Sequence, residues 1–368
     1  MDNYALNHNW RTPLSVRAEW QTAIHTSVNG GESRSALRRY PKVYFSYHVS
    51  DRLSYFEMRQ LAQADGFIVP LWWVSSRLRQ STGFGDDDMF FSDDYLGVPP
   101  YVWVDGDFYK VNTATSSPRK LVISGLLRPT LAGTKIYAAY PVKVMDSPAT
   151  TFYSGTASET KQLSMMVLGE YYCPRGMAKS DVQDLFSAKQ PNKSSPDSST
   201  SEGLFSDFLA AGGADNRLGL ASRSRESHSF SYLLKDQAEG HEMWEALGRL
   251  GGRMEAISLP TWRVLPLIRS YGNTLEFEHT PGVFEALDST ALWILERDGT
   301  TATALTNYPS ISGDVVSVDS ALPLAKEYTP DMAVIMRRAQ SARLSSDTVE
   351  FLYHTPYVTE IQLGFTEV

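Results

Sequence analysis

The chain has 368 residues, of which 42% are hydrophobic and 21% charged, a composition typical of a folded protein and unlike that of a disordered chain. Its formal net charge of −8 argues against a nucleic-acid-binding surface, because such surfaces neutralise phosphates with an excess of Lys and Arg. The single cysteine, Cys173, excludes an intrachain disulfide framework and a zinc site built from several thiolates. At about 150 residues per domain, the length predicts two domains.

Residues 1–19 are expected to form an N-terminal arm that lies on a neighbouring subunit. The segment contains Trp10 and Pro13 and is too short to fold alone. Its first residues are polar and acidic rather than basic and apolar, so we expect no secretory signal and synthesis in the cytosol. No apolar stretch approaches the ~20 residues that cross a bilayer, so we also expect no membrane span.

Short sequence matches recur in the same order along the chain. The spacing between partners never decreases from one match to the next, which is typical of a duplication with small insertions in the second copy. Chance matches would scatter in both directions. The matched pairs are Gly30-Gly31 and Gly212-Gly213, Phe45-Ser46-Tyr47 and Phe230-Ser231-Tyr232, Pro70-Leu71-Trp72 and Pro260-Thr261-Trp262, Trp103 and Trp293, Leu127-Arg128-Pro129 and Ala321-Leu322-Pro323, and Thr160 and Thr359.

Each copy has the same pattern of predicted elements. Runs rich in Val, Ile, Tyr, Trp and Thr, separated by Gly, Pro, Asp and Asn, predict strands. Apolar residues at helical spacing predict one helix in each copy, over residues 52–64 and 239–250, closed by Gly66 and by Gly251-Gly252. The predicted fold is therefore mainly β, with two tandem, related β-sandwich or β-barrel units that each carry one short α-helix.

The duplication predicts copy one over residues 20–170 and copy two over residues 205–368. Residues 171–204 lie between them and are rich in Ser and Pro, most of all over residues 187–201. Because that stretch offers little to bury, we expect a mobile linker that lets the two copies be positioned separately.

Sequence signatures of common enzymes are missing. The chain has no Gly-x-Ser-x-Gly, no phosphate-binding Gly-x-x-x-x-Gly-Lys-Ser/Thr, no Gly-x-Gly-x-x-Gly and no His-Glu-x-x-His. Its histidines are scattered, and nothing near Cys173 would activate a thiol. We therefore predict no catalytic, cofactor-binding or metal-ligating residue, no cofactor and no enzymatic activity. A pair of carboxylates for glycoside hydrolysis can come from distant positions, so the sequence leaves that alternative open.

The segment from Gly83 to Tyr95 concentrates aspartate and phenylalanine in copy one only. Repulsion among its carboxylates must be relieved by solvent, by a basic partner surface or by a cation. Calcium loops place carboxylates at alternate positions, a spacing that Asp86, Asp87 and Asp88 do not follow. Exposed phenylalanines favour contact with a partner. The possible partner-contact residues are Phe84, Asp86, Asp87, Asp88, Phe90 and Phe91.

The repeated tryptophans and prolines are interpreted as the framework of each copy rather than as a binding site. Large aromatic side chains contribute most when they are packed in a core. The predicted framework residues are Pro70, Trp72 and Trp103 in copy one and Pro260, Trp262 and Trp293 in copy two.

Two passages resemble segments of tailed-bacteriophage tail and baseplate proteins. In those proteins a strand ending in Thr-Asp and an aliphatic residue is followed by Gly-x-Glu-x-Arg, an Ala-Leu-Arg run and Pro-Arg. Ala23, Ser33 and Lys42 here replace the usual Asp, Gln and Arg. The similar passages are Glu19-Trp20-Gln21-Thr22-Ala23-Ile24 with Asn29-Gly30-Gly31-Glu32-Ser33-Arg34-Ser35-Ala36-Leu37-Arg38-Arg39-Tyr40-Pro41-Lys42, and Met243-Trp244-Glu245-Ala246-Leu247-Gly248-Arg249-Leu250-Gly251-Gly252-Arg253 leading to Leu259-Pro260-Thr261-Trp262.

The resemblance implies a virion protein of the distal-tail or baseplate type, assembled in the host cytoplasm. Such proteins form rings between the tail tube and the hub or the fibres. The expected partners are other copies of this chain, in a trimer or hexamer, and the tail tube, baseplate hub or tail-fibre proteins. Three two-copy chains would form a quasi-sixfold ring that joins a sixfold tube to a threefold hub. Two alternatives remain, a tail-associated polysaccharide hydrolase and a receptor-binding module.

Overall fold

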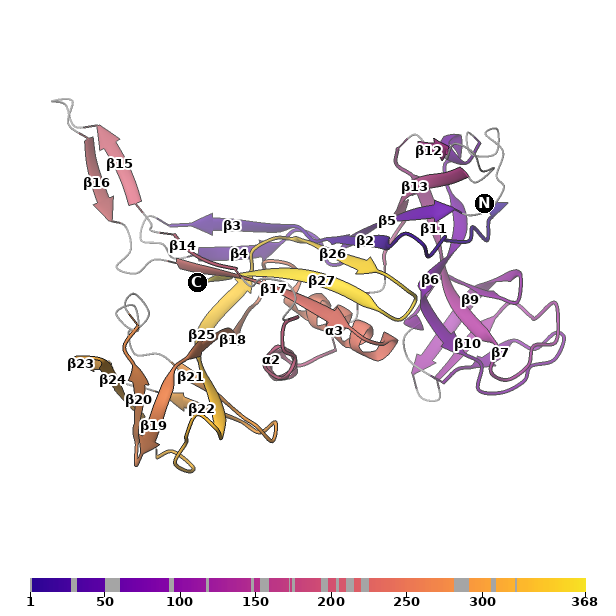
Figure 1. Cartoon of the computed structure of the whole chain (residues 1–368). Coiled ribbons are helices and arrows are strands. Elements are labelled where there is room, and N and C mark those ends of the chain that lie inside the picture. The colour runs from indigo at the N-terminus through magenta and orange to yellow at the C-terminus, as the bar shows by residue number, and fades with distance from the viewer. Residues whose placement is uncertain are drawn as a thin grey trace.

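The computed structural model in Figure 1 describes most of the chain and is mainly β, as expected. The described residues are 2–27, 32–49, 60–92, 96–116, 119–146, 149–152, 159–171, 173, 176–192, 198–202, 205–209, 215–219, 225–280, 291–305, 309–321 and 323–368.

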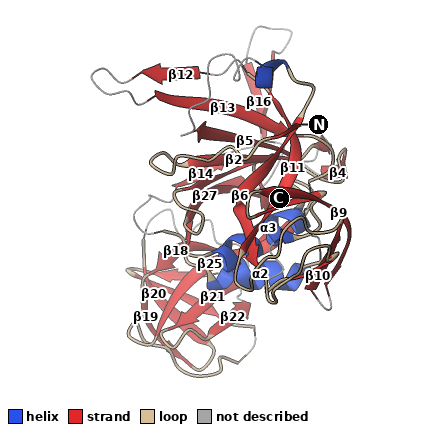
Figure 2. Ribbon diagram, turned by 90° about the vertical axis from the view of Figure 1, so that its right-hand side faces the viewer, coloured by secondary structure: helices blue, strands red, loops and turns tan. Residues whose placement is uncertain are grey.

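A series of antiparallel strands runs through the middle of the molecule and is here called the central sheet. Each member pairs with the next, and the series passes from the second half of the chain to the first where β26 meets β2. In Figure 2, β12, β13, β5 and β2 follow one another in this order. The series is β14 (Ser198–Glu202), β17 (Arg225–Leu234), β27 (Thr359–Glu367), β26 (Thr348–Tyr353), β2 (Leu14–Glu19), β5 (Lys42–Val49), β13 (Glu159–Val167) and β12 (Ala149–Phe152).

The central sheet has one buried and one polar face because its side chains alternate. In β5, Val43, Phe45 and Tyr47 are buried, whereas Lys42 is exposed and Ser46 is only half-buried. The same alternation of buried apolar and more exposed polar residues runs through β2, β26 and β27. A period of two is the pattern of a sheet that is covered on one side only.

Two lobes extend from this sheet, one from each half of the chain (Figure 1). The first contains β6 (Phe67–Arg77), β7 (Asp88–Phe90), β8 (Tyr101–Val104), β9 (Asp107–Ser116), β10 (Arg119–Ile123) and β11 (Lys135–Val144). The second contains β18 (Ala256–Leu265), β19 (Leu267–Tyr271), β20 (Thr274–Glu278), β21 (Ala291–Glu296), β22 (Thr301–Leu305), β23 (Ser310–Ser312), β24 (Val315–Asp319) and β25 (Ala333–Leu344). The second lobe encloses its own apolar cluster, which includes Phe277 and Ile335.

Each half also forms a two-stranded hairpin before its main lobe. The first hairpin pairs β3 (Thr22–Thr26) with β4 (Glu32–Ala36), and the second pairs β15 (Phe205–Leu209) with β16 (Asp215–Gly219). The two glycine pairs that matched in the sequence lie in the connections of these hairpins, at residues outside the described ranges.

Helix α3 (Gln237–Leu250) confirms the helix predicted over residues 239–250. Asp236 caps its first turn by accepting a hydrogen bond from the backbone N–H of Glu239 at 2.9 Å. Gly251 ends it in the left-handed conformation at φ 60°. Of the helix predicted over residues 52–64, residues 52–59 lie outside the described ranges and residues 60–63 are helical.

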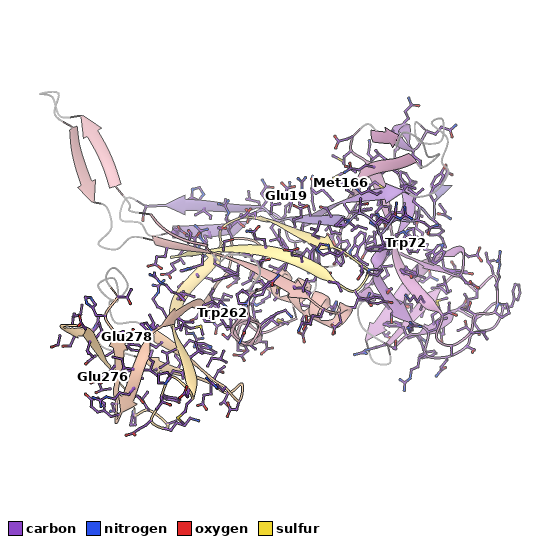
Figure 3. The ribbon with its side chains drawn as sticks, viewed as in Figure 1. Glu19, Trp72, Met166, Trp262, Glu276 and Glu278 are labelled. Carbon is purple, nitrogen blue, oxygen red and sulfur yellow. The ribbon has the colours of Figure 1, made fainter. Side chains whose placement is uncertain are left out.

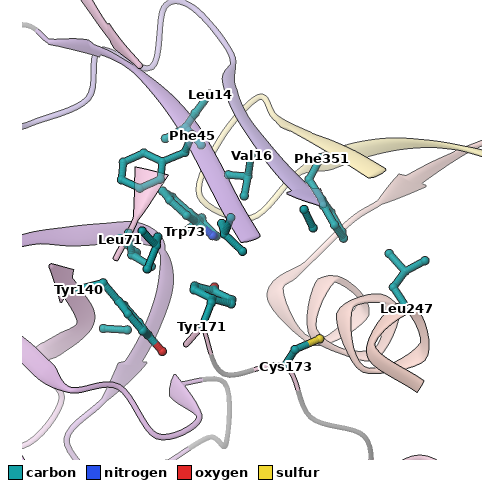
Figure 4. Packing of buried hydrophobic residues seen from close by; sticks show 14 of the residues in the cluster. Leu14, Val16, Phe45, Leu71, Trp73, Tyr140, Tyr171, Cys173, Leu247 and Phe351 are labelled. Carbon is teal, nitrogen blue, oxygen red and sulfur yellow. The ribbon is translucent and has the colours of Figure 1, made fainter. Parts of the chain in front are cut away.

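The prediction of a mobile linker over residues 171–204 is wrong for most of its described part. Helix α2 (Lys179–Ala188) lies there, and its Val182 and Phe186 are fully buried. Tyr171 and Cys173 are buried in the same cluster (Figure 4). The prediction failed because the segment contains a short amphipathic helix. The apolar side chains of α2 lie on one face, and that face packs beneath the central sheet. Residues 193–197, in the Ser- and Pro-rich part, lie outside the described ranges.

The prediction that residues 1–19 form an arm on a neighbouring subunit is also wrong. β1 (Asp2–Asn3) pairs in parallel with β6, and the backbone N–H of Tyr4 bonds the carbonyl of Ile68 at 2.9 Å. β2 then lies between β5 and β26. Because β26 is near the C-terminus, β2 joins the two halves of the chain through backbone hydrogen bonds.

The two halves share one hydrophobic cluster, so they are not positioned separately. It extends from Leu6 to Phe365. Trp73 of the first half lies 5.9 Å from the ring of Tyr353, and Trp20 lies 6.3 Å from Trp244. Figure 4 shows Phe45 and Trp73 of the first half in the same packed region as Phe351 and Leu247 of the second. Apolar packing across the β2–β26 junction therefore couples the halves.

Candidate functional site

Both halves build their lobes with the same strand pairings. In the first half β13 pairs with β5 and β11, and β11 pairs with β6 and β8. In the second half β27 pairs with β17 and β25, and β25 pairs with β18 and β21. The matched sequences occupy matching places in these ladders, since Phe45 lies opposite Met165 and Phe230 lies opposite Leu363.

The two Pro-x-Trp motifs each start a β-bulge. In the first lobe Pro70 lies opposite Ala139, and the ladder resumes only at Ser75 opposite Tyr137. In the second lobe Pro260 lies opposite Arg338, and the ladder resumes at Val264. A bulge bends its strand and re-aims the side chains within it. Trp72 and Trp262, labelled in Figure 3, lie within these two bulges.

The other framework residues also lie at corresponding positions. Trp103 lies opposite Tyr137 in the β8–β11 ladder, and Trp293 lies opposite Met336 in the β21–β25 ladder. Trp72 packs against Trp103 with ring centroids 5.3 Å apart. In the second lobe the guanidinium of Arg338 covers the Trp293 ring at 4.8 Å.

The acidic loop divides into an internal and an external part. Phe91 is buried, and Asp88 forms an ion pair with Lys120 at 2.9 Å. Lys120 also lies 5.9 Å from the ring of Phe90. These contacts hold β7 against β10, so they belong to the lobe's own packing.

The external part of the loop turns tightly around Asp86 and Asp87. The Asp86 carboxylate accepts a hydrogen bond from the backbone N–H of Gly83, and the Asp87 carbonyl accepts one from Ile123 at 2.8 Å. The hydrogen bond to Asp86 and the ion pair between Asp88 and the Lys120 ammonium reduce the repulsion among these carboxylates. Phe84 points outward, with 77% of its surface exposed.

Two further exposed apolar side chains lie on the loop beside Phe84. Leu127 is 63% and Leu131 75% exposed. Gly85 N–H bonds the carbonyl of Leu126 at 2.9 Å, and Thr82 bridges to Thr130, so the two loops run together at the tip of the first lobe. The run of Asp and Phe residues pointed to Phe84 as a contact residue, whereas no aromatic or charge pattern marks Leu127 or Leu131 as exposed.

A buried group of charged side chains lies at one end of the second half of the sheet. The His228 Nε2 atom is 3.0 Å from Glu367 and 3.8 Å from Glu226. Arg337 donates to Glu226 at 2.5 Å and also to Glu367. Burial acts to raise the pKa of Glu367, but the bonds from His228 and Arg337 outweigh it and hold that pKa below its usual value.

This buried group has the ligand types of a metal site, yet its geometry is that of an ion-pair network. Ligand atoms of Glu226, His228 and Glu367 lie within 4.8 Å of one another. Arg337 contacts both carboxylates and supplies the positive charge that a metal would bring. The corresponding ladder positions of the first half hold Val43 and Ala138, so this network exists in the second half only.

The polar face of the central sheet is continuous across both halves. Gln162 donates to Ser46 at 2.9 Å in the first half, and Gln362 donates to Ser229 at 3.1 Å in the second. At the junction Ser15 donates to Glu350 at 2.5 Å. Short hydroxyl and amide side chains thus pair across neighbouring strands, as in a face that stays in contact with water.

The two ends of the central sheet are open edges among the described strands. β12 pairs with β13 only, and β14 pairs with β17 only. An edge strand presents unpaired backbone N–H and C=O groups and is a template for another strand. The edges and the polar face between them form the candidate assembly surface.

Within the described ranges, no helix has the length and apolar character needed to span a membrane. No protein-family model and no curated protein matches this chain.

Proposed function

We propose that this chain is a structural component of a phage tail tip or baseplate and forms a ring that joins the tail tube to the hub or fibres. The similarity of the passages around Gly30-Gly31 and Trp244 to tail and baseplate proteins supports this assignment. It acts through shape and assembly rather than through a reaction, and its partners are copies of itself and neighbouring tail proteins.

The observation that carries the proposal is the repeated ladder within one continuous sheet. We infer that the two halves are copies of one β unit, the first from β2 to β13 and the second from β14 to β27. Corresponding strands pair in both, the Pro-x-Trp bulges recur, and each unit has a hairpin before its first long strand. A unit that occurs twice in one chain suits a ring in which three chains supply six similar positions.

The central sheet adds a second argument. Polar side chains occur on the same face of the sheet in both units, and apolar packing holds the two units in one orientation. A rigid pair of units is suited to a permanent assembly, because little conformational entropy remains to be lost on association.

The test is the position of the chain in an intact virion, by cryo-EM of assembled tails or by labelling of an epitope on the chain. We expect density for it at the distal end of the tail, as three chains with approximate sixfold symmetry. A location in the capsid, or no location in the virion, would overturn the structural role. A true sixfold ring of this chain would overturn the quasi-sixfold arrangement alone.

A further inference from the structure

The two open edges of the central sheet correspond to the two strands that join the units inside the chain. β14 pairs antiparallel with β17 as β2 pairs with β5, and each precedes a hairpin in the chain. β12 pairs antiparallel with β13 as β26 pairs with β27, and each connects directly to that strand. Each unit therefore has two edge strands. One is β2 in the first unit and β14 in the second, and the opposite one is β12 in the first unit and β26 in the second.

Inside the chain these two kinds of edge pair with each other. β26 of the second unit lies antiparallel against β2 of the first, from Leu14 opposite Tyr353 to Glu19 opposite Thr348. Backbone hydrogen bonds and the Ser15–Glu350 contact hold that junction. The structure therefore contains one complete example of how two units meet edge to edge.

We propose that β12 of one chain pairs antiparallel with β14 of the next chain, in the manner of β26 and β2 within the chain. This inference rests on the proposed ring. The occupant of each edge is a second copy of this chain, and the central sheet continues from one subunit to the next with its polar face on one side.

The geometry of the contact distinguishes a ring from a dimer. β12 and β14 are different strands at opposite ends of the sheet, so the contact is heterologous, and each chain keeps one edge free for a further neighbour. Such contacts close into a ring or extend into a filament. Closure also removes the open edges, which otherwise are sites of unspecific strand addition.

Disulfide cross-linking of the full-length chain tests the pairing. A single cysteine is introduced at the β12 edge, for example Thr150→Cys, and another at the β14 edge, at each position from Ser195 to Glu202 in turn. The register of β26 against β2, carried over to these edges, sets Thr150 opposite position 195, so linkage should be strongest at that end of the scan. The native Cys173 is buried, which keeps the background low. The control combines Thr150→Cys with Thr301→Cys on β22, which pairs with β21 and lies outside the central sheet.

We expect a mixture of the two singly substituted chains to give linked dimers, and the doubly substituted chain to give a ladder that stops at the ring order. Linked thiols held side by side have a high effective concentration, so the yield should exceed that of the control pair by on the order of tenfold. The best-linked pairs should have residue numbers that rise in one strand as they fall in the other, because the strands are antiparallel.

Three outcomes would overturn the inference. They are equal cross-linking of the control pair, linkage of Thr150→Cys chains to one another in preference to chains with a cysteine at the β14 edge, and no linkage at any scanned pair in a preparation that electron microscopy shows to contain rings. The last result leaves the proposed function intact. Linkage between β12 and β14 in a protein that is not found in tails would instead overturn the proposed function and leave the edge pairing standing.

Discussion

Trp72 donates its indole N–H to the backbone carbonyl of Leu6 at 2.6 Å, and this bond ties the N-terminal segment to the bulge of β6. Both residues are buried in the shared hydrophobic cluster. The bond explains why the N-terminal segment lies on its own chain: a buried indole N–H needs an acceptor, and residues before β2 supply it.

Replacing Trp72 should therefore have two separable effects. Trp72→Ala removes a ring packed against Trp103 and Tyr137 and should reduce the free energy of unfolding by about 3–5 kcal/mol. Trp72→Phe keeps an aromatic ring but leaves the Leu6 carbonyl without this donor, and should cost about 1–3 kcal/mol. Urea unfolding followed by tryptophan fluorescence and circular dichroism measures both. A Trp72→Ala protein of unchanged stability would contradict the framework assignment.

Acid should weaken the packing of the N-terminal segment through His8. Burial, the largest cause, and the neighbouring His48 together lower the pKa of His8 from 6.5 to about 4. The His8 Nδ1 atom accepts from the His48 backbone N–H at 3.1 Å, which leaves no room for a proton there. The Nε2–H then donates to the carbonyl of Thr12 at 3.0 Å.

Between pH 6.5 and about 4 the unfolded chain binds a proton at His8 that the folded chain does not. Stability from this group is therefore complete above pH 6.5 and falls as the pH drops toward 4. His8→Gln should flatten the pH dependence of the unfolding free energy in that window, whereas His25→Gln, at an exposed position, serves as the control. An unchanged slope in His8→Gln would contradict the assignment.

Arg337 should stabilise two half-buried carboxylates that lie side by side. Arg337→Met leaves Glu226 and Glu367 without their shared cation and should cost about 1–3 kcal/mol at neutral pH. Because Arg337 helps to hold the pKa of Glu367 below its usual value, the stability that this carboxylate contributes is lost as the pH falls through that lowered pKa, and Arg337→Met should make this pH dependence shallower. Urea unfolding at several pH values checks both effects.

A double substitution provides the matched control for the buried network. Arg337→Ala with His228→Val copies Ala138 and Val43 of the first half and removes two members of the network together. Adding Glu367→Leu to that pair removes a carboxylate that no longer has a partner. We expect this triple variant to be more stable than Arg337→Met, and the reverse order would argue against an equivalent packing of the two halves.

The acidic loop should contain one residue whose loss affects stability and one whose loss does not. Phe91→Ala removes a buried ring and should cost about 3–5 kcal/mol. Phe84→Ser changes an exposed side chain and should alter stability by no more than about 0.5 kcal/mol. If the lobe tip contacts a partner, Phe84→Ser should lower incorporation of the soluble, folded chain into tails. Denaturation curves and quantitative blotting of purified virions separate the two effects.

The local pattern of residues was enough to predict much of the fold. Runs rich in Val, Ile, Tyr, Trp and Thr, separated by Gly, Pro, Asp and Asn, predicted a mainly β protein, and the spacing of Met243, Leu247 and Leu250 before a glycine predicted α3. The Phe-Ser-Tyr and Pro-x-Trp matches marked positions that occupy corresponding places in the two sets of ladders. Each of these signals depends on neighbours in sequence, so each can be read from the chain alone.

The placement of segments relative to one another depended on contacts that no local pattern contains. Leu14 and Val16 lie in β2, whose partners β5 and β26 come from opposite ends of the chain. The segment expected to lie on a neighbouring subunit therefore joins the two halves of its own chain. Val182 and Phe186 lie in a segment that was expected to be a linker, but they pack in the hydrophobic cluster beneath the central sheet. The sequence by itself determined which residues form strands and helix faces. Only the tertiary structure decided which edges are paired and which stay open, because strand pairing is set by long-range backbone hydrogen bonds and shared burial.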